Sequence, residues 1–376
     1  MKNLWKRVGA AVLVAAMFLL GACGAPGEDT KPTGEINMTP VDLDLQKDVL
    51  YFGRTYSKAR IQWMNWSGSG FSVRFQGSAL AAEFYSNMPE TKDIAYLKVY
   101  IDGVEQEDIR LDKDIELVML AEDLDPNAEH TVEVRKRTNA RSSTAGLSRL
   151  VLMDGQVLAP EKPKERLIEF IGDSLTVGYM ASKEGKTATA WNTMTEDITG
   201  TYCPQVAKAF GAEYQVVAIS GRGVVRNNGG DENMLFPEIY AQTDIYNAPD
   251  MPYDFAVQPD VIVINLGSND ESASNKDLSP KTFRKGMEAF LEQVRQCNPN
   301  AQILCVYGLV RVGLSESIEE AVNNLQDAGD ANIHYLQLEQ CQKWELNLNH
   351  TVASAYIPRG EAIIAKIQEI TGWEVS

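Results

Sequence analysis

The sequence predicts an antiparallel β-sandwich over residues 47–160, followed by an α/β domain with a parallel sheet over residues 166–376. Three observations support this prediction. The first half shows short apolar–polar alternation with regular turn signals. The second half shows continuous apolar runs that alternate with helical patterns. Between them, "APEKPKER" combines prolines with clustered charges. A chain of 376 residues has room for two domains of roughly 150 residues each.

The first 23 residues are typical of a lipoprotein signal peptide. A basic start, "MKNLWKR", precedes the apolar run "VGAAVLVAAMFLL", which is too short to span a bilayer comfortably. The run ends in "LGAC", which looks like a bacterial lipobox with Cys23 as the lipidated residue. We therefore expect an exported cell-surface or periplasmic lipoprotein, anchored by acyl chains rather than by a helix. The alternative is a signal peptide in which Cys23 is incidental.

The overall charge limits the possible partners. The formal net charge is −17, and an acidic field repels phosphates. Nucleic acid is therefore excluded as an expected partner, and contact with a membrane is expected only through the lipid anchor. The simplest interpretation of the charge is a soluble acidic surface. The sequence predicts no oligomeric state.

The sandwich is expected to follow a linker over residues 24–46, which is rich in Gly, Pro, Thr and acidic residues. Residues 47–160 then contain short alternating runs, and Asp102-Gly103 is a hairpin signal. The predicted strands lie in "FSVRFQGSALAAEFYS", "AYLKVYIDGV", "HTVEVRKRT" and "SRLVLMDG".

The α/β domain is predicted from buried apolar runs separated by amphipathic segments. The predicted parallel strands are "LIEFIG", "YQVVAIS", "DVIVINLG", "QILCVYG" and "IHYLQL". The predicted helices are "CPQVAKAFG", "SPKTFRKGMEAFLEQVRQCNP", "SESIEEAVNNLQDAG" and "PRGEAIIAKIQEITG". The second of these helices begins with a Ser-Pro pair suited to an N-cap and first helical position.

The cysteines lack the CxxC spacing of a zinc or thioredoxin-type site. We expect the four cysteines beyond the signal peptide to be buried free thiols, although export permits disulfides. They are Cys203, Cys297, Cys305 and Cys341. Among the histidines, His130 opens a predicted sandwich strand. His334 lies inside the apolar run "NIHYLQL", where a core histidine with satisfied hydrogen bonds is expected.

Four loops that follow predicted strands or precede the last helix carry residues suited to acyl transfer. The carboxyl ends of parallel strands meet at one edge of the sheet, where ligands bind. The hydroxyl of Ser174 becomes nucleophilic when a base such as His350 removes its proton. Backbone N–H groups near Ser174 and Gly221 and the amide of Asn269 can stabilise the resulting oxyanion. Taken singly, Ser174 also fits a helix cap, Gly221 a tight turn and Asn269 an Asx-turn.

The blocks "FIGDSLTVGY", "ISGRGVVRN" and "NLGSND", with a lone C-terminal histidine, resemble the SGNH or GDSL hydrolases over residues 166–376. A closer likeness is to carbohydrate esterase family two, the acetyl xylan esterases. It rests on "GAEYQVVAISGRGVVRN", "FPEIYAQTDIYNAPDMPYDFAVQPDVIVINLGSND", and the upstream "IDG" and "HTVEVRKRTNA". The resemblance implies a three-layer SGNH hydrolase domain preceded by a jelly-roll sandwich.

By position, the resemblance implies Ser174 as nucleophile and His350 as general base. It also implies an oxyanion hole formed by the N–H groups of Ser174 and Gly221 and the side chain of Asn269, without metal or organic cofactor. Most SGNH enzymes have an Asp three residues before the histidine, where this chain has Asn347. The family-two esterases are often dyads in which a backbone carbonyl orients the histidine. They usually have His-Pro in this loop, where this chain has "NHTVASAY".

Charged residues near these loops have structural explanations. Asp270 is expected to support its loop through hydrogen bonds rather than take part in the chemistry. Arg222 and Arg226 either contact the substrate or pair with Asp231 and Glu232, and we favour the pairing.

Aromatic rings near the loops are candidate platforms for sugar stacking, with core packing as the alternative for each. The candidates are Tyr179, Trp191, Phe236 and Trp344. In the sandwich, Trp63 and Trp66 offer either a carbohydrate-binding face or part of a contact between domains.

The resemblance implies an esterase that deacetylates an acetylated polysaccharide or oligosaccharide of xylan or mannan type. Two alternatives stay open. One is a lipase, thioesterase or envelope-glycan deacetylase with the same fold, and the other is a catalytically inactive lipoprotein that binds glycan.

Overall fold

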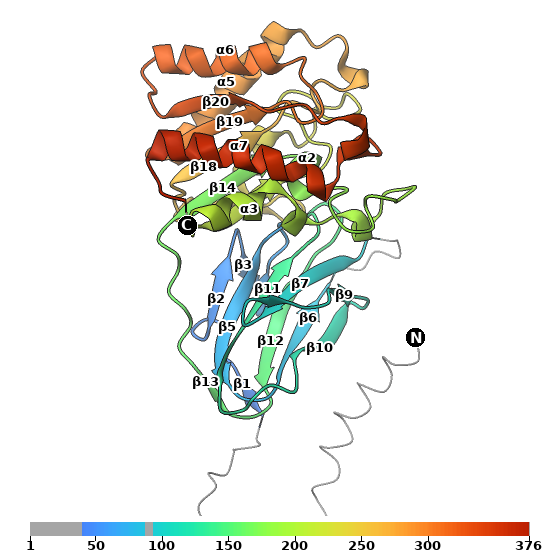
Figure 1. The fold of residues 1–376 in the computed structure, drawn as a ribbon, viewed down its shortest axis with the longest axis vertical. Coiled ribbons are helices and arrows are strands. Elements are labelled where there is room, and N and C mark those ends of the chain that lie inside the picture. The colour runs from blue at the N-terminus through green and yellow to red at the C-terminus, as the bar shows by residue number, and fades with distance from the viewer. Residues whose placement is uncertain (1–39, 87–92, 376) are drawn as a thin grey trace, which may run out of the picture. The chain divides into compact units, whose positions relative to one another are not determined.

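The computed structural model describes residues 40–86 and 93–375, which all belong to one unit (Figure 1). The expected signal peptide with Cys23, and residues 24–39 of the expected linker, lie outside the described residues. Val41–Asp42, which the sequence assigned to the linker, pairs with a sandwich strand. Within the part of the chain that is described, no helix combines the length and apolar character needed to cross a membrane.

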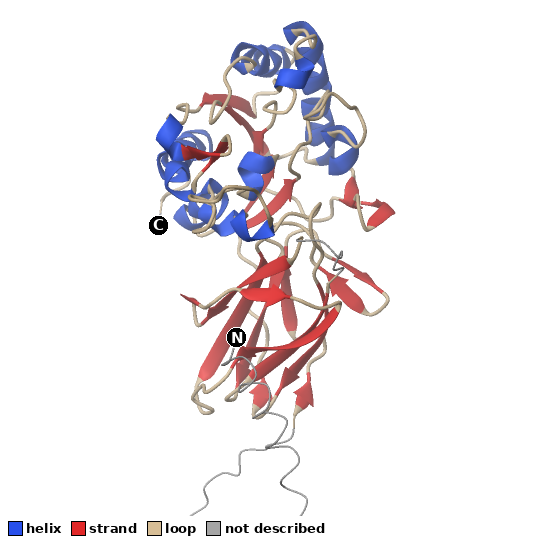
Figure 2. Ribbon diagram, turned by 90° about the vertical axis from the view of Figure 1, so that its right-hand side faces the viewer, coloured by secondary structure: helices blue, strands red, loops and turns tan. Residues whose placement is uncertain are grey.

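The first half forms two antiparallel sheets that enclose one core (Figures 1 and 2). One sheet has the order β10-β6-β12-β4-β3, with β1 paired to β12. Its strands are β1 (Val41–Asp42), β3 (Tyr56–Lys58), β4 (Ile61–Trp63), β6 (Leu80–Tyr85), β10 (Ile115–Ala121) and β12 (Gly146–Leu152). The other sheet has the order β13-β5-β11-β7-β8, with β2 on β5 and β9 on β7. Its strands are β2 (Val49–Phe52), β5 (Gly70–Gln76), β7 (Ala95–Ile101), β8 (Val104–Glu105), β9 (Ile109–Leu111), β11 (Glu129–Lys136) and β13 (Gln156–Val157).

Side-chain alternation explains the sandwich. Phe71, Val73 and Phe75 of β5 point into the core and are fully buried, whereas Arg74 between them is only half-buried. The hairpin predicted at Asp102-Gly103 is confirmed, because β7 and β8 pair across it. Both turn residues have positive φ, 52° and 78°, as a two-residue type I′ turn requires.

The second half is built on a five-stranded parallel sheet in the order β15-β14-β18-β19-β20. The strands are β14 (Leu167–Gly172), β15 (Glu213–Ala218), β18 (Val261–Asn265), β19 (Gln302–Tyr307) and β20 (Ile333–Gln337). Each lies in an apolar run that predicts it. Because β14 comes first in sequence but lies between β15 and β18, the chain changes direction across the sheet there, which creates a topological switch point.

Helices cover both faces of this sheet and give three layers (Figures 1 and 2). α3 (Tyr202–Ala209) and α7 (Ala353–Thr371) share one core with Phe170 of β14. α4 (Phe236–Tyr240), α5 (Pro280–Cys297) and α6 (Ser315–Asp327) share another core with Ile171 on the opposite face. The short elements are α2 (Ser174–Val177), η1 (Thr193–Thr195), η2 (Ile198–Gly200), η3 (Ala273–Asn275), η4 (Lys343–Glu345), and the strand pairs β16 (Gln242–Asp244) with β17 (Ala248–Pro252) and β21 (Leu346–Asn347) with β22 (His350–Thr351).

α7 begins earlier than predicted. The sequence predicts a start at Pro358, because proline fits the first turn of a helix, but the helix begins at Ala353 and contains Pro358. Tyr356 gives the physical reason: its buried ring lies against Tyr202 of α3, with ring centroids 5.8 Å apart, and its hydroxyl donates to the carbonyl of Leu175 in α2 at 2.7 Å. This packing extends the helix on the N-terminal side of the proline.

A buried ion pair joins the sandwich to the parallel sheet. Arg54, which follows β2, is 1% exposed and donates to the carboxylate of Glu169 in β14 at 3.2 Å. Gln215 and Tyr240 donate to the same carboxylate, each at 2.8 Å. Nearby, the buried Trp66 donates to the carbonyl of Thr243 at 2.8 Å, which identifies this tryptophan as part of the contact between domains.

The four cysteines beyond Cys23 are unpaired, as predicted. Cys203, Cys305 and Cys341 are buried, whereas Cys297 at the end of α5 is half-buried.

Candidate active site

The carboxyl ends of three neighbouring strands deliver the predicted site residues. Ser174 follows β14, Gly221 follows β15 and Asn269 follows β18. The strands are in register up to their ends, since Gly172 of β14 pairs with Ala218 and Asn265. The side chain of Asn269 contacts both of the other loops, because its Nδ2 donates to Oδ2 of Asp173 at 3.1 Å and to the carbonyl of Arg222 at 2.8 Å.

Ser174 and His350 form a hydrogen-bonded pair. Nε2 of His350 lies 2.9 Å from Oγ of Ser174, and Nδ1 lies 2.9 Å from the carbonyl of Leu348. A carbonyl only accepts, so Nδ1 carries the proton and Nε2 is the acceptor for the serine hydroxyl. Burial lowers the pKa of His350 below 6.5, against the opposing effect of the Leu348 carbonyl. The imidazole is therefore neutral and able to accept a proton at pH 7.

A strained hairpin presents His350. In the β21–β22 pair, Asn347 is paired with His350 and the two intervening residues both have positive φ, 46° at Leu348 and 60° at Asn349. Positive φ is unfavourable for leucine and costs about 1–3 kcal/mol. The turn places the Leu348 carbonyl against the imidazole, which is the backbone contact that the resemblance implied.

Asn347 anchors a neighbouring loop rather than the imidazole. Its Nδ2 donates to the carbonyls of Gly185 at 2.6 Å and Ala188 at 2.9 Å. An amide suits this position because it has two N–H donors for two carbonyl acceptors, whereas a carboxylate has none.

The expected oxyanion donors belong to the three loops that follow β14, β15 and β18. The N–H of Ser174 belongs to the first residue of α2, where N–H groups lack acceptors within the helix. Gly221 is the third residue of a turn in which Arg222 N–H donates to the Ile219 carbonyl at 3.4 Å, and its φ of 83° is one that glycine adopts without strain. Both amide hydrogens of Asn269 are already donated, one to Asp173 and one to the carbonyl of Arg222. To stabilise an oxyanion, one of these hydrogens has to be shared between its present acceptor and the oxyanion.

Asp173 and Asp270 stabilise the loops around these donors. Asp173 is fully buried, caps α2 through the N–H of Leu175 at 2.9 Å, and also accepts from Ser268. Burial raises the pKa of Asp173 to about 6. Asp270 accepts from three consecutive backbone N–H groups, those of residues 224–226, at 2.7–3.0 Å. Asp270 therefore has the structural hydrogen-bonding role that the sequence predicts, although the loop that it supports is the neighbouring one after β15.

An aromatic stack packs on the imidazole of His350. Tyr179 stacks on His350 with ring centroids 4.2 Å apart, and Trp191 stacks on Tyr179 at 5.2 Å with the planes only 8° apart. Trp344 is 75% exposed and Phe236 is fully buried. Two of the four candidate aromatics thus lie at the dyad, Trp344 lies on the surface and Phe236 belongs to the core.

The arginines of the glycine loop are paired, as predicted. Arg222 lies 3.9 Å from Asp231, and Arg226 lies 3.4 Å from Glu232. Arg226 also contacts Asp277 at 2.8 Å.

The other two histidines lie in strands away from Ser174. His130 in β11 lies 2.8 Å from Asp102, and His334 in β20 lies 2.9 Å from Gln302. His130 lies in the sandwich strand where the sequence placed it, and His334 is half-buried and hydrogen-bonded within its strand rather than at the dyad.

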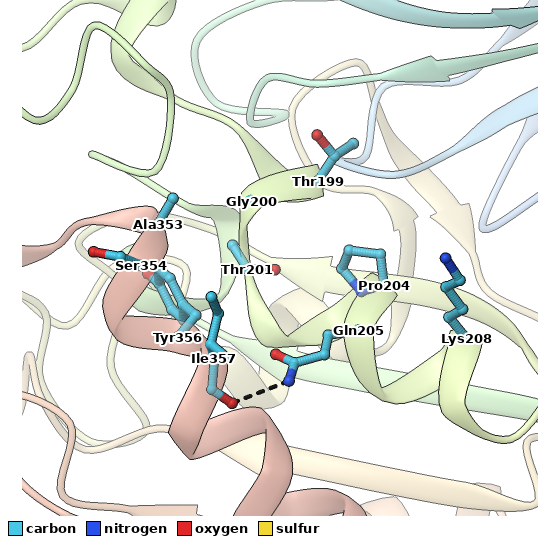
Figure 3. A pocket seen from close by; sticks show the side chains of 10 residues that line it. All are labelled: Thr199, Gly200, Thr201, Pro204, Gln205, Lys208, Ala353, Ser354, Tyr356 and Ile357. Carbon is cyan, nitrogen blue, oxygen red and sulfur yellow. Dashed lines mark hydrogen bonds between the residues drawn. The ribbon is translucent and has the colours of Figure 1, made fainter. Parts of the chain in front are cut away.

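The described structure also has a cavity of about 420 Å³ between α3 and the start of α7 (Figure 3). Its lining combines apolar residues such as Pro204 with polar ones such as Gln205, and Gln205 donates to the carbonyl of Ile357 at 3.0 Å. Neither Ser174 nor His350 lines it, so we place the candidate chemistry at the strand ends rather than here.

Sequence reasoning left two contributors to the site unidentified. The resemblance implied a backbone carbonyl that orients His350, but no residue type identifies Leu348 as its source in advance. The other contributor, which the sequence missed altogether, is the sandwich loop after β11, where Asn139 and Arg141 reach Ser220 beside Gly221. These residues lie about 80 positions away in sequence, and only the packing between domains brings them to the site.

Family comparisons agree with this architecture. Residues 51–161 match the model described as Carbohydrate esterase 2 N-terminal, and residues 170–345 match the GDSL-like Lipase/Acylhydrolase family. The predicted fold class, a sandwich followed by an SGNH-type α/β domain, is confirmed by these matches.

Two curated relatives are similar over much of the chain. The Cellulase/esterase CelE of Acetivibrio thermocellus is 28% identical over 339 residues, which are 86% of this chain and 40% of that protein. This chain therefore spans less than half the length of that relative. An Acetylxylan esterase / glucomannan deacetylase of Cellvibrio japonicus is 30% identical over 283 residues, 70% of this chain and 74% of that protein.

Solved structures show the same fold. A family two carbohydrate esterase from Clostridium thermocellum, in complex with cellohexaose, superposes with a TM-score of 0.79 at 26% identity, covering 86% of this chain and 99% of that one. The acetyl xylan esterase Est2A from Butyrivibrio proteoclasticus has a TM-score of 0.79 at 22% identity, covering 90% and 99% respectively, which is a likeness of fold.

Proposed function

Because the chain belongs to the family-two carbohydrate esterases, we propose that it hydrolyses acetyl esters on a polysaccharide or oligosaccharide of xylan or mannan type. One observation supports this proposal most strongly. Oγ of Ser174 lies 2.9 Å from a histidine nitrogen that is free to accept its proton, at the switch point of a parallel sheet.

In the proposed mechanism, His350 takes the proton from Ser174 as Oγ attacks the acetyl carbonyl. The tetrahedral intermediate expels the sugar hydroxyl, which receives that proton from His350, and an acetyl-serine remains. Water then attacks the acetyl group with His350 again acting as base, and acetate leaves. The Leu348 carbonyl stabilises the imidazolium through Nδ1–H in both steps, a role that a carboxylate fills in a triad.

The oxyanion is stabilised by the N–H groups of Ser174 and Gly221 and by the amide of Asn269. Preorganised donors matter because they need no rearrangement as charge develops on the carbonyl oxygen. Asn269 donates to Asp173 at 3.1 Å, its longer bond, and we expect the oxyanion to share this N–H.

Aromatic surfaces are proposed to bind the sugar. Tyr179 and Trp191 form a stacked aromatic surface next to the imidazole. The indole of Trp344 is exposed and lies two residues before β21, the first strand of the hairpin that carries His350. The relatives support a glycan substrate, since one is named for acetylxylan and glucomannan and one was solved with cellohexaose.

We also propose export and lipid anchoring through Cys23. Residues 1–23 have the organisation of a lipoprotein signal, and residues 24–39 would tether the enzyme to the membrane surface. Mass spectrometry of the mature N-terminus tests this, because a diacylated Cys23 is the expected product.

The enzymatic proposal is tested by acetate release from acetylated xylan and from 4-nitrophenyl acetate. Ser174→Ala should lower both activities by at least about 10³-fold, since no other group replaces the nucleophile. Ser354→Ala, an exposed serine in α7, is the matched control and should be neutral. Unchanged hydrolysis by Ser174→Ala would overturn the mechanism. A wild-type protein inert on all short-chain esters would favour a glycan-binding lipoprotein.

A further inference from the structure

The loop between β11 and β12 brings sandwich residues to the proposed oxyanion turn. Nδ2 of Asn139 donates to Oγ of Ser220 at 3.0 Å, and Nη1 of Arg141 donates to the carbonyl of Ser220 at 3.2 Å. Two residues of one domain thus hold both the side chain and the backbone of a single residue in the other domain.

Asn139 itself is fixed by hydrogen bonds from several directions. Its N–H donates to the carboxylate of Glu196 at 3.0 Å, its carbonyl accepts from Nζ of Lys136 at 3.3 Å, and its Oδ1 accepts from the N–H of Arg141 at 2.8 Å. Asn139, Lys136 and Glu196 are all buried. The loop therefore provides a rigid support for the Arg141 backbone, next to Ser220.

Gly221 leaves room for the guanidinium. A Cβ atom at position 221 would lie 3.2 Å from Nη1 of Arg141, closer than most Cβ contacts. Arg141 is exposed, and its guanidinium donates to the carbonyl of Ser220. Its charge also acts on the ring beside His350: burial raises the pKa of Tyr179 to about 12, and the nearby Arg141 opposes this rise.

The Ser220 carbonyl and the Gly221 N–H belong to the same peptide group. A cationic donor on the carbonyl oxygen withdraws electron density from that group and makes its N–H a stronger donor. It also fixes the orientation of the peptide plane, which sets the direction of the N–H.

We propose that Arg141 and Asn139 of the sandwich are positioning residues for catalysis, which hold and polarise the Ser220–Gly221 peptide so that its N–H stabilises the oxyanion. This inference rests on the proposed function, because it assigns the Gly221 N–H to the oxyanion hole. It gives the sandwich a part in the chemistry beyond any contact with glycan.

The test compares Arg141→Ala and Arg141→Lys with wild type on 4-nitrophenyl acetate, a substrate too small to reach distant sugar sites. Arg141→Ala should lower kcat about tenfold with little change in KM. This loss is smaller than the loss from removing an oxyanion donor entirely, because the Gly221 N–H stays in place. Its affinity for a phenylboronic acid, which forms a tetrahedral adduct with serine, should fall by a similar factor. Arg141→Lys should recover part of the loss, and guanidinium ions at tens of millimolar should partly rescue Arg141→Ala.

Arg149→Ala is the control, because Arg149 lies on β12 of the same sandwich and pairs with Asp42 at the surface. It should leave kcat and boronate affinity unchanged. The inference is overturned if Arg141→Ala keeps kcat and boronate affinity within twofold, or if it changes only KM for acetylated xylan, which would indicate direct glycan contact. Ser174→Ala measured alongside separates the two proposals: if that variant stays active the proposed function fails, and if it is inactive while Arg141→Ala is normal only this inference fails.

Discussion

Ser174 and His350 share one hydrogen bond, but different kinds of structure hold them in place. Ser174, Gly221 and Asn269 follow buried parallel strands. The strands before Ser174 and Asn269 pair on both sides, and the strand before Gly221 pairs in register with β14. His350 lies in a hairpin of two-residue strands, and a backbone carbonyl orients its ring. The nucleophile is therefore positioned by the core of the domain, whereas the base depends on a strained turn and on the stacked ring of Tyr179.

Among changes in the hairpin that carries His350, we expect removal of the imidazole to lower activity most. His350→Ala should reduce kcat/KM for 4-nitrophenyl acetate by roughly 10³- to 10⁵-fold, because Ser174 then lacks a proton acceptor. The Leu348 carbonyl cannot substitute, since it faces Nδ1 rather than the serine. Added imidazole should restore part of the activity. His334→Ala is the control and should retain most activity, and a similar collapse in that variant would point to a folding defect instead.

The pH dependence of kcat/KM reports on one titrating group in each region, Asp173 beside Ser174 and His350 in the hairpin. His350 has a lowered pKa and must be neutral, whereas Asp173 has a raised pKa of about 6 and holds Ser268 and Asn269 when ionised. Both are in the active form above their pKa values, so log(kcat/KM) should be flat near pH 7 and fall below about pH 6. With both groups titrating, the slope should exceed one per pH unit. Asp173→Asn should reduce the slope to one, and an unchanged slope would assign the acid limb to His350 alone.

A smaller effect is expected from restoring the residue that most SGNH enzymes carry. Asn347→Asp should lower kcat/KM about tenfold, because a carboxylate facing the carbonyls of Gly185 and Ala188 repels them and loosens the loop that leads to Trp191. Asn349→Asp, at the exposed tip of the same hairpin, should be nearly neutral. A gain of activity in Asn347→Asp would mean that the carboxylate reaches His350, contrary to the observed hydrogen bonds.

The smallest effect is expected on stability, from relieving the backbone strain at Leu348. Leu348→Asn should raise Tm by about 1–2 °C, because asparagine tolerates positive φ better than leucine. The orienting carbonyl belongs to the backbone, so activity should stay within twofold. Ile357→Asn replaces another exposed apolar residue at an ordinary helical position and should not raise Tm. A loss of activity above tenfold in Leu348→Asn would show that the leucine side chain contributes to the site.

The same contrast explains what the sequence predicts. Strands such as Leu167–Gly172 are continuous apolar runs, so the sheet, its switch point and the places of Ser174, Gly221 and Asn269 follow from local pattern together with the family resemblance. The predicted start of α7 at Pro358 was wrong. Proline is a strong local signal for the first turn of a helix, but the packing of Tyr356 extends the helix before it.

Features without a local pattern could not be predicted. The turn at Leu348-Asn349 lacks the Asn-Gly or Asp-Gly sequence typical of its geometry. The resemblance implied an orienting carbonyl, but no local pattern marks Leu348 as the residue that supplies it. The approach of Arg141 to Ser220 depends on how two domains pack, which hydrophobic periodicity within either domain does not encode.

The ion pair between Arg54 and Glu169 has an evolutionary consequence. Glu169 is 1% exposed in the strand that ends just before Asp173 and Ser174, and a deletion of the sandwich would leave its carboxylate without its cation. Breaking such a buried pair typically costs about 3–5 kcal/mol. A gene fusion or truncation that separated the two domains would carry this cost, so we expect the two domains to be inherited together as a single cassette.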